Sequence, residues 1–291
     1  MLERHLVQEK GAKNGLLLAP TSGGKTLVAI VLLLHTMLVE KKDGLLALPF
    51  IALVSEKVRE LKVLSTKLGL FSIAEYAGCR GHFPPRRAKR NLRTLYVATT
   101  EKAMILWKSL CRDGDRRAEI GLTVFDELHM LGEGVRGAVL EELIVSMLHL
   151  AGNTNRLFAL SATVGNPEEI QAFLGGGCRD RCSTYYVTKR PKRIAEFMVV
   201  SGSAISIERG EDGRGHIDFA SGRKLVLLED GALLADSELD MFTNLEDRMT
   251  AKLVFEAMMK EASVLIFCST RSMCPQLCNT LTKACEAILT G

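Results

Sequence analysis

The sequence predicts an α/β fold in which a parallel sheet is covered by helices on both faces. Short apolar runs alternate with longer amphipathic segments, which is typical of strands alternating with helices. The strands read as nearly continuous apolar runs, as expected for strands buried on both faces. The polar motifs all follow such runs, and in a parallel sheet functional loops lie at the carboxyl ends of the strands.

The expected elements follow one another at short intervals. The run at 15–20 stops at Pro20 and predicts a strand followed by a loop. Helical spacing of apolar residues is clearest over 51–68, where they repeat along one face. We expect further strands at 45–48, 95–98, 122–125 and 157–160, and further helices at 26–39, 101–110 and 135–150.

The pattern changes after residue 187. Glycine and serine are frequent over 200–225, which predicts a loop or a loose hairpin between two domains. Helical spacing returns over 245–261, and the apolar run 264–267 predicts another strand. We therefore expect a second α/β domain to begin here, with the chain ending inside it.

Composition excludes disorder and gives only a weak indication of partners. The chain has 291 residues, of which 47% are hydrophobic and 25% charged, as in an ordinary globular protein. A net charge of +4 is compatible with a polyanionic partner. The eight cysteines form no Cys-x-x-Cys pair and no signal peptide opens the chain, so we expect a reducing compartment. We interpret Cys274, Cys278 and Cys285 as small buried residues of a helix rather than metal ligands, and we expect no membrane segment.

Residues 19–26, Ala-Pro-Thr-Ser-Gly-Gly-Lys-Thr, match a phosphate-binding loop except that Ala19 replaces the first glycine. Glycines let the backbone turn its N–H groups toward a phosphate, and the following helix offers a positive dipole end. Lys25 would reach the β and γ phosphates, and the hydroxyl of Thr26 would bind Mg²⁺. The expected ATP-binding residues are Thr21, Ser22, Gly23, Gly24, Lys25 and Thr26.

An acidic pair follows the apolar run 122–125 and would complete an ATP site. Asp126 would hold Mg²⁺ directly or through water, and Glu127 would polarise the attacking water. An Asp-Glu pair at a strand end is weak evidence alone, but it gains specificity from the phosphate-binding loop about a hundred residues upstream.

The segment Asp126-Glu127-Leu128-His129 is a DExH box and, with Ser161-Ala162-Thr163, resembles superfamily 2 helicases. The resemblance implies that His129, Ser161, Ala162 and Thr163 couple the ATP site to the nucleic-acid track, and that Lys25, Asp126, Glu127 and His129 are catalytic. It also implies a first RecA-like P-loop NTPase domain at 1–187, a linker at 188–244 and an incomplete second RecA-like domain at 245–291.

Two further loops resemble nucleic-acid-gripping motifs of these helicases. Residues 48–57 look like motif Ia and residues 98–103 like motif Ib. Segments 75–78, 83–85 and 126–137 look like the superkiller-type branch, and within it helicase Q and the helicase domain of DNA polymerase theta. The implied nucleic-acid contacts are Pro49, Phe50, Lys57, Thr100, Glu101, Lys102 and Arg136.

The resemblance implies an ATP-dependent DNA helicase that moves 3′→5′ on single-stranded or forked DNA, acts in repair in the nucleus and works as a monomer with ATP and Mg²⁺. The upstream Q motif, motifs V and VI and the accessory domains of the family are not found in the sequence. Because motif VI supplies arginines that stabilise the transferred phosphoryl group, we expect this chain alone to hydrolyse ATP poorly.

Two alternatives remain open at this stage. One is an RNA helicase of the superkiller type. The other is a non-catalytic isoform that binds nucleic acid or a partner helicase. The basic stretch 80–93 is equally compatible with a DNA-backbone contact and a solvated loop, whereas a solvated face is favoured for the basic residues of 189–193.

Overall fold

The computed structural model divides the chain into two compact units, Met1–Lys192 and Arg193–Gly291. It describes the first unit over most of its length and the second in short pieces. The described residues are 14–20, 23–85, 92–113, 116–150, 155–162, 164–187, 197–200, 203–206, 208–209, 215–216, 224–226, 250, 253–254, 257 and 263–290.

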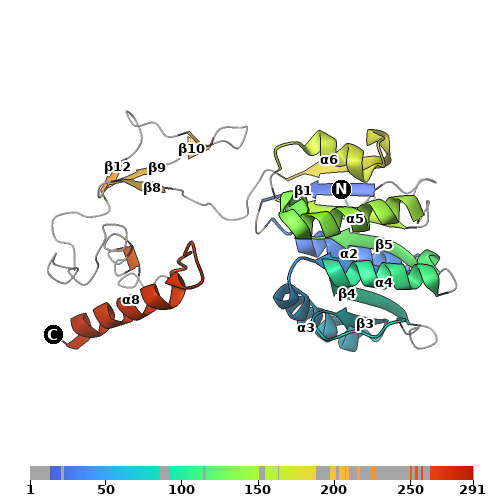
Figure 1. Ribbon diagram of the computed structural model, residues 1–291, viewed down its shortest axis with the longest axis horizontal. Coiled ribbons are helices and arrows are strands. Elements are labelled where there is room, and N and C mark those ends of the chain that lie inside the picture. Colours follow the sequence, from blue (N-terminus) through green and yellow to red (C-terminus); the bar gives the residue numbers. More distant parts are fainter. Residues whose placement is uncertain are drawn as a thin grey trace. The chain divides into compact units, whose positions relative to one another are not determined.

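The first unit is built on a seven-stranded sheet in the order β3-β4-β2-β5-β6-β1-β7 (Figure 1). Every neighbouring pair is parallel. Every residue of β2, β5 and β6 is buried, which explains why these strands read as continuous apolar runs. The strands are β1 Asn14–Leu18, β2 Asp43–Leu48, β3 Phe71–Tyr76, β4 Arg93–Thr99, β5 Ile120–Phe125, β6 Arg156–Ser161 and β7 Cys182–Tyr186.

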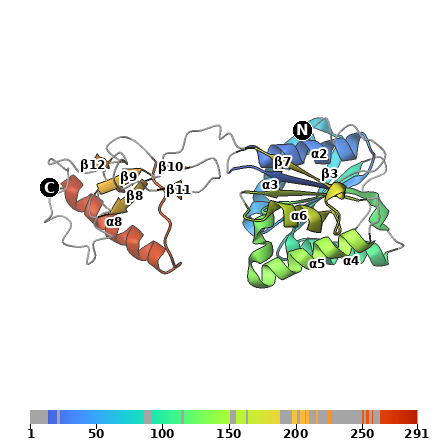
Figure 2. The same ribbon diagram turned by 90° about the horizontal axis from the view of Figure 1, so that it is seen from above.

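Helices cover both faces of this sheet (Figure 2). Helices α2 and α3 contribute to one buried apolar cluster, and α4, α5 and α6 to the other. Each therefore buries its apolar stripe against the strands, as amphipathic helices in α/β domains do. The helices are α2 Lys25–Leu38, α3 Ile51–Leu68, α4 Thr100–Arg112, α5 Gly134–Leu150 and α6 Pro167–Leu174.

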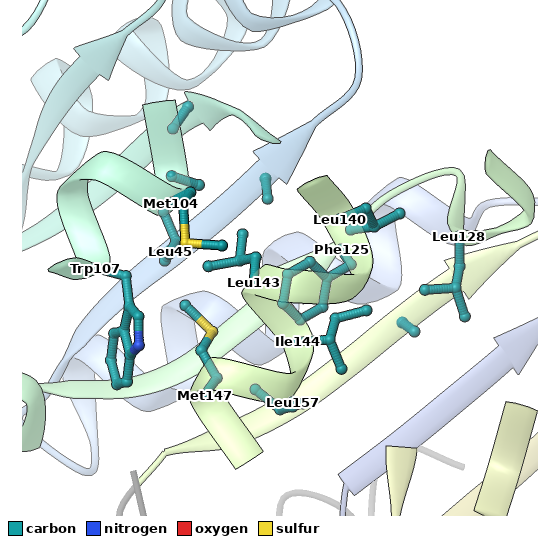
Figure 3. Packing of buried hydrophobic residues seen from close by; sticks show 14 of the residues in the cluster. Leu45, Met104, Trp107, Phe125, Leu128, Leu140, Leu143, Ile144, Met147 and Leu157 are labelled. Carbon is teal, nitrogen blue, oxygen red and sulfur yellow. The ribbon is translucent and has the colours of Figure 1, made fainter. Parts of the chain in front are cut away.

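The single tryptophan anchors the cluster beneath α4 and α5 (Figure 3). Trp107 of α4 is fully buried in the same cluster as Leu143 and Met147 of α5. Its indole Nε1 donates a hydrogen bond to Ser146 Oγ at 3.1 Å, so the polar atom of the ring is satisfied. Trp107 thus joins α4 to α5.

The amino edge of the sheet holds buried charge within closed networks. Arg116 is buried, and its guanidinium donates to Pro85 O at 2.7 Å and pairs with Asp113 and Glu119. At the start of β2, the buried carboxylate of Asp43 accepts a hydrogen bond from Thr94 N at 3.0 Å. Buried charges with such partners are compatible with a purely structural role.

The second unit is described over small sheets and one long helix. Strands β8 Phe197–Val200 and β9 Ser203–Ser206 form an antiparallel pair, joined by β12 Lys224–Val226, and β10 Glu208–Arg209 pairs with β11 Gly215–His216. The loop or loose hairpin expected over 200–225 stays a prediction, because the structure describes only short pieces of that segment. Helix α8 spans Met273–Thr290. None of the described helices is both long and apolar enough to cross a bilayer.

The alternation of strands and helices in the first unit is confirmed, with a seven-stranded parallel sheet and RecA-like order. The predicted helix 51–68 coincides with α3, and the other expected helices and strands of this unit agree within a few residues. Strands β3 and β7 and helix α6 were not predicted. β3 and β7 lie at the two edges of the sheet, where burial is partial and the apolar signal is weak.

Two expectations for the second unit are wrong. Residues 264–267 form neither strand nor helix, and Leu265 and Phe267 are largely exposed. An apolar run becomes a strand only when neighbouring strands pair with it, and the described residues provide none there. Cys274 and Cys278 are exposed rather than buried, and Cys285 lies outside the residues whose burial is described. Of the helix expected over 245–261, only residues 250, 253–254 and 257 are described, and they are helical.

Candidate nucleotide and nucleic-acid site

The phosphate-binding loop joins β1 to α2 at the carboxyl edge of the sheet. Ala19 N donates to Ser161 O at 3.1 Å, which ties the loop to the end of β6. Gly24 has a φ of 79°, a conformation that glycine adopts at little cost. A Cβ on Gly23 would lie only 2.8 Å from Pro20 O, so the tight turn requires glycine there.

Lys25 begins α2 and lies across this loop. Its side chain is 9% exposed, and Nζ donates to Ala19 O at 2.9 Å and Pro20 O at 3.3 Å. The loop backbone thus holds the ammonium group at the start of the helix, where an anion would also meet the helix dipole. Thr26 follows and is half-buried. The predicted contacts Thr21 and Ser22 lie outside the described residues.

The acidic pair follows β5 directly. Asp126 N donates to Ala47 O at 3.0 Å, and Asp126 Oδ1 accepts from Glu127 N at 3.0 Å. Glu127 has a φ of 55° and a ψ of 50°, the left-handed conformation that costs a non-glycine residue about 1–2 kcal/mol. Such strain is typical of functional sites, and here it turns the Glu127 side chain away from the strand direction.

Burial is the main influence on the acidity of Asp126. Removal from water raises the pKa of this carboxyl above its ordinary value of 3.8, and repulsion from Glu127 raises it further. The hydrogen bond from Glu127 N and the charges of Lys25 and Lys57 act in the opposite direction and do not overcome burial. A cation beside this carboxyl would stabilise its charged form, which is the property expected of a metal ligand.

The DExH histidine lies against the acidic pair. His129 is in the 3-10 helix η2 Leu128–Gly132, and its Nδ1 lies 3.3 Å from Glu127 Oε2. Leu128 is fully buried and fixes this turn in the core. Ser161 at the end of β6 is also fully buried, Ala162 is half-buried, and the predicted coupling residue Thr163 lies outside the described residues.

The acidic pair and several predicted nucleic-acid contacts line one small cleft. Asp126 and Glu127 form part of its wall, so residues far apart in the chain are brought together by the carboxyl ends of β2, β4 and β5. The remaining lining residues are Pro49, Thr100, Glu101, Met130, Arg136 and Leu140.

Phe50 and Arg136 form a cation–π contact at this cleft. The Arg136 guanidinium carbon lies 5.1 Å from the centre of the Phe50 ring, and Phe50 is 43% exposed. An exposed aromatic beside an exposed guanidinium is suited to a base and a phosphate of a single strand. Lys57 differs from this pair, because its ammonium already pairs with Glu60 at 2.9 Å and lies 3.9 Å from Glu56.

A third loop joins this surface and was not assigned to it from the sequence. Lys102 Nζ lies 5.8 Å from the centre of the Phe83 ring, and Phe83 packs on Tyr76 with ring centres 5.2 Å apart. Arg80 of the basic stretch pairs with Glu75 at 2.5 Å. The sequence feature that could have indicated this contact is Phe83, an aromatic residue within the basic stretch 80–93. Residues 86–91 of the stretch lie outside the described residues.

Comparison with known proteins shows which family the chain resembles. Residues 4–170 match the family model for DEAD/DEAH box helicases. The chain is 35% identical over 279 residues to the human protein named Helicase POLQ-like, covering 95% of this chain and 23% of that protein. It is 32% identical over 271 residues to DNA polymerase theta of Drosophila melanogaster, covering 91% of this chain and 12% of that protein.

An archaeal relative and a solved structure extend the comparison. The ATP-dependent DNA helicase Hel308 of Pyrococcus horikoshii is 34% identical over 163 residues, covering 56% of this chain and 21% of that protein. The crystal structure of the DUF1998 helicase MrfA superposes with a TM-score of 0.60 at 15% identity, covering 96% of this chain and 37% of that one, which shows a shared fold. The chain spans less than a quarter of the length of each of the three sequence relatives. With its family model matched over more than half of its length, the chain belongs to the DEAD/DEAH box helicase family.

Proposed function

We propose that this protein is an ATP-dependent DNA helicase that translocates 3′→5′ on single-stranded DNA and acts in repair in the nucleus. One observation carries the proposal: Asp126 and Glu127 line the same cleft as Thr100, Glu101 and Arg136. An ATP site and a nucleic-acid surface that share a wall are what a motor needs to link hydrolysis to grip. The three sequence relatives described above, whose names include two helicases and a DNA polymerase, favour DNA as the nucleic acid.

The residues present fit ATP with Mg²⁺. The turn at Gly23 has no room for a side chain, and the chain at Gly24 has a positive φ, which suits a backbone cradle for phosphates. Lys25 would hold the β and γ phosphates, and Thr26 and Asp126 would hold Mg²⁺, with Thr21 and Ser22 completing the loop. Bound there, Mg²⁺ would neutralise phosphate charge.

Glu127 is the residue that would orient the attacking water. Its left-handed backbone and the 3.3 Å approach of His129 Nδ1 to its carboxylate support this role, because they would restrict the carboxylate before substrate binds. His129, with Ser161, Ala162 and Thr163, would report the state of this site to the nucleic-acid surface. That surface would comprise Pro49, Phe50, Lys57, Thr100, Glu101, Lys102 and Arg136.

We further propose residues 1–187 as the first motor domain, 188–244 as a linker and 245–291 as the opening of the second, in a motor that works as a monomer on single-stranded or forked DNA. ATP would draw the two domains together, and release of products would let them part.

Steady-state ATPase assays test the proposed function. Rates would be measured with no nucleic acid, with single-stranded DNA and with RNA of the same sequence, on this chain and on a form that carries a complete second RecA-like domain. We expect the longer form to be stimulated by DNA more strongly than by RNA, and its Lys25→Ala variant to be inactive. Equal stimulation by RNA would instead support an RNA helicase, and DNA binding without hydrolysis would support a non-catalytic role.

A further inference from the structure

A second cavity adjoins the DExH turn. It has a volume of about 560 Å³ and lies between η2, α5 and the segment that runs from Val164 into α6. Pockets for small molecules typically have volumes of roughly 300–1,000 Å³. None of the residues assigned to ATP or nucleic acid lines it except His129.

The floor of this cavity is apolar. Leu131, Val164, Ile170 and Phe173 pack against the cluster that contains Trp107, yet each is only half-buried. Their remaining exposed surface faces a concave space, where an apolar ligand would remove it from water at a gain in free energy. A flat patch would offer a ligand much less contact.

The rim of the cavity is acidic. Glu141 of α5 and Glu169 of α6 both line it and are exposed. Glu169 Oε2 accepts a hydrogen bond from Asn166 Nδ2 at 2.6 Å, which holds this carboxylate in place. Within the part of the chain that the structure describes, neither carboxylate forms an ion pair with a basic side chain. Two carboxylates beside an apolar floor complement a ligand that combines an apolar body with a positive charge.

We propose that this cavity is a binding site for a small amphipathic cation, with an apolar body on the α5–α6 floor and one ammonium or guanidinium group between Glu141 and Glu169. The site adjoins the catalytic turn through His129, whose Nδ1 lies 3.3 Å from Glu127 Oε2. A ligand held there therefore contacts the DExH turn at Leu128 and His129, which do not line the cleft of Asp126 and Arg136. This places a regulatory ligand one residue contact away from Glu127, and that regulatory role rests on the proposed function.

The binding test uses 4-phenylbutylamine as the probe and the neutral 4-phenylbutan-1-ol as its matched control, titrated into the full chain by ligand-observed NMR without nucleotide. We expect saturable binding of the amine and weaker binding of the alcohol. Glu141→Gln combined with Glu169→Gln should weaken amine binding about fivefold, as expected for loss of two partly exposed charge contacts. Glu168→Gln, on the same helix but outside the cavity, should leave amine binding unchanged.

A second readout locates the ligand. The imidazole resonances of His129 should shift with the same saturation curve as the amine, whereas those of exposed His149 at the far end of α5 should not. Equal affinity for the alcohol, an equal loss in Glu168→Gln, or saturation without a His129 shift would overturn the proposal. Because nucleotide plays no part in this titration, failure of the ATPase proposal would leave its result interpretable.

Discussion

Two aspartates at opposite ends of the sheet, Asp43 buried and Asp126 half-buried, show how the same residue type serves two purposes. Asp43 begins β2 at the amino edge, and Asp126 follows β5 at the carboxyl edge. Burial raises the pKa of each, and each accepts one backbone hydrogen bond at 3.0 Å. Arg93 and Arg116 lower the pKa of Asp43 and Glu119 raises it. Lys25 and Lys57 lower the pKa of Asp126, and the acid next to it in the chain, Glu127, raises it.

The difference lies in how completely each carboxylate is compensated. At the amino edge the second acid, Glu119, forms an ion pair with the buried Arg116, so the charges there compensate one another. The carboxyl edge places a second acid beside the first, holds Glu127 in a strained conformation and leaves both facing a cleft. Two neighbouring carboxylates that repel each other and face a cleft indicate a binding site for a ligand. Four predictions test this comparison, from the largest effect to the smallest.

Replacing Glu127 with glutamine should lower the DNA-stimulated ATPase kcat at least roughly 100-fold, because an amide does not accept a proton from water. Steady-state phosphate release in a form with both motor domains measures it. Nucleotide affinity should be little changed, and far-UV circular dichroism should report an intact fold. Normal kcat in this variant would remove Glu127 from the catalytic role.

Asp43→Ala should do the reverse, destabilising the fold by about 1–3 kcal/mol while leaving nucleotide affinity unchanged. The variant leaves the buried N–H of Thr94 without its acceptor. A buried donor without a partner lowers the free energy of unfolding, because it has lost its hydrogen bonds to water and gains none in the fold. Urea unfolding followed by Trp107 fluorescence measures the change. A loss of ATP affinity without a loss of stability would contradict the structural role of Asp43 and place it in the nucleotide site.

Arg136→Ala should weaken binding of single-stranded DNA roughly threefold to tenfold and reduce the slope of log affinity against log salt by about 0.7, the effect of one phosphate contact. Fluorescence anisotropy at several salt concentrations measures both quantities. Lys108→Ala is a matched control, because Lys108 is exposed on α4 and pairs with Glu142 instead of lining the cleft. An equal slope change in the control would mean that Arg136 contributes only general charge.

The smallest effect concerns pH. The raised pKa of Asp126 means that the folded chain favours the protonated carboxyl, so this residue supports stability most fully below pH 3.8 and that support is lost as pH rises through the raised pKa. Asp126→Asn removes this loss, so the stability of the variant relative to the parent should improve as pH rises from 3.8 through the raised pKa of Asp126. Urea unfolding across that range tests the trend. A pH-independent difference would contradict the raised pKa of Asp126.

Much of the first unit could be predicted from the sequence, because strands buried on both faces give continuous apolar runs and α3 gives a clear helical period. The ATP site could be predicted because Gly23, Gly24 and Lys25 lie between a strand and a helix. The edge strands β3 and β7 could not, since partial burial weakens their pattern. The run 264–267 shows the reverse error, an apolar segment with no described strand beside it.

Contacts between distant loops were also beyond the sequence. Motif resemblance implied that Phe50 and Arg136 contact nucleic acid. Only the fold shows that the guanidinium of Arg136 lies over the ring of Phe50. The same holds for Phe83 beside Lys102, and for the cavity at His129, whose walls include residues of two separate helices, α5 and α6. Which loops lie side by side depends on the order of the strands in the sheet, and that order cannot be deduced from one sequence alone.

Equilibrium binding of a fluorescent ATP analogue in the presence of Mg²⁺ tests the central claim most directly, because it asks whether the carboxyl edge of this chain holds nucleotide. The account predicts saturable binding to the chain, at least roughly tenfold weaker binding to Lys25→Ala, whose ammonium would contact the phosphates, and unchanged binding to Asp43→Ala. Binding that is equal in the parent and Lys25→Ala, or that is lost in Asp43→Ala with its fold intact, would contradict it.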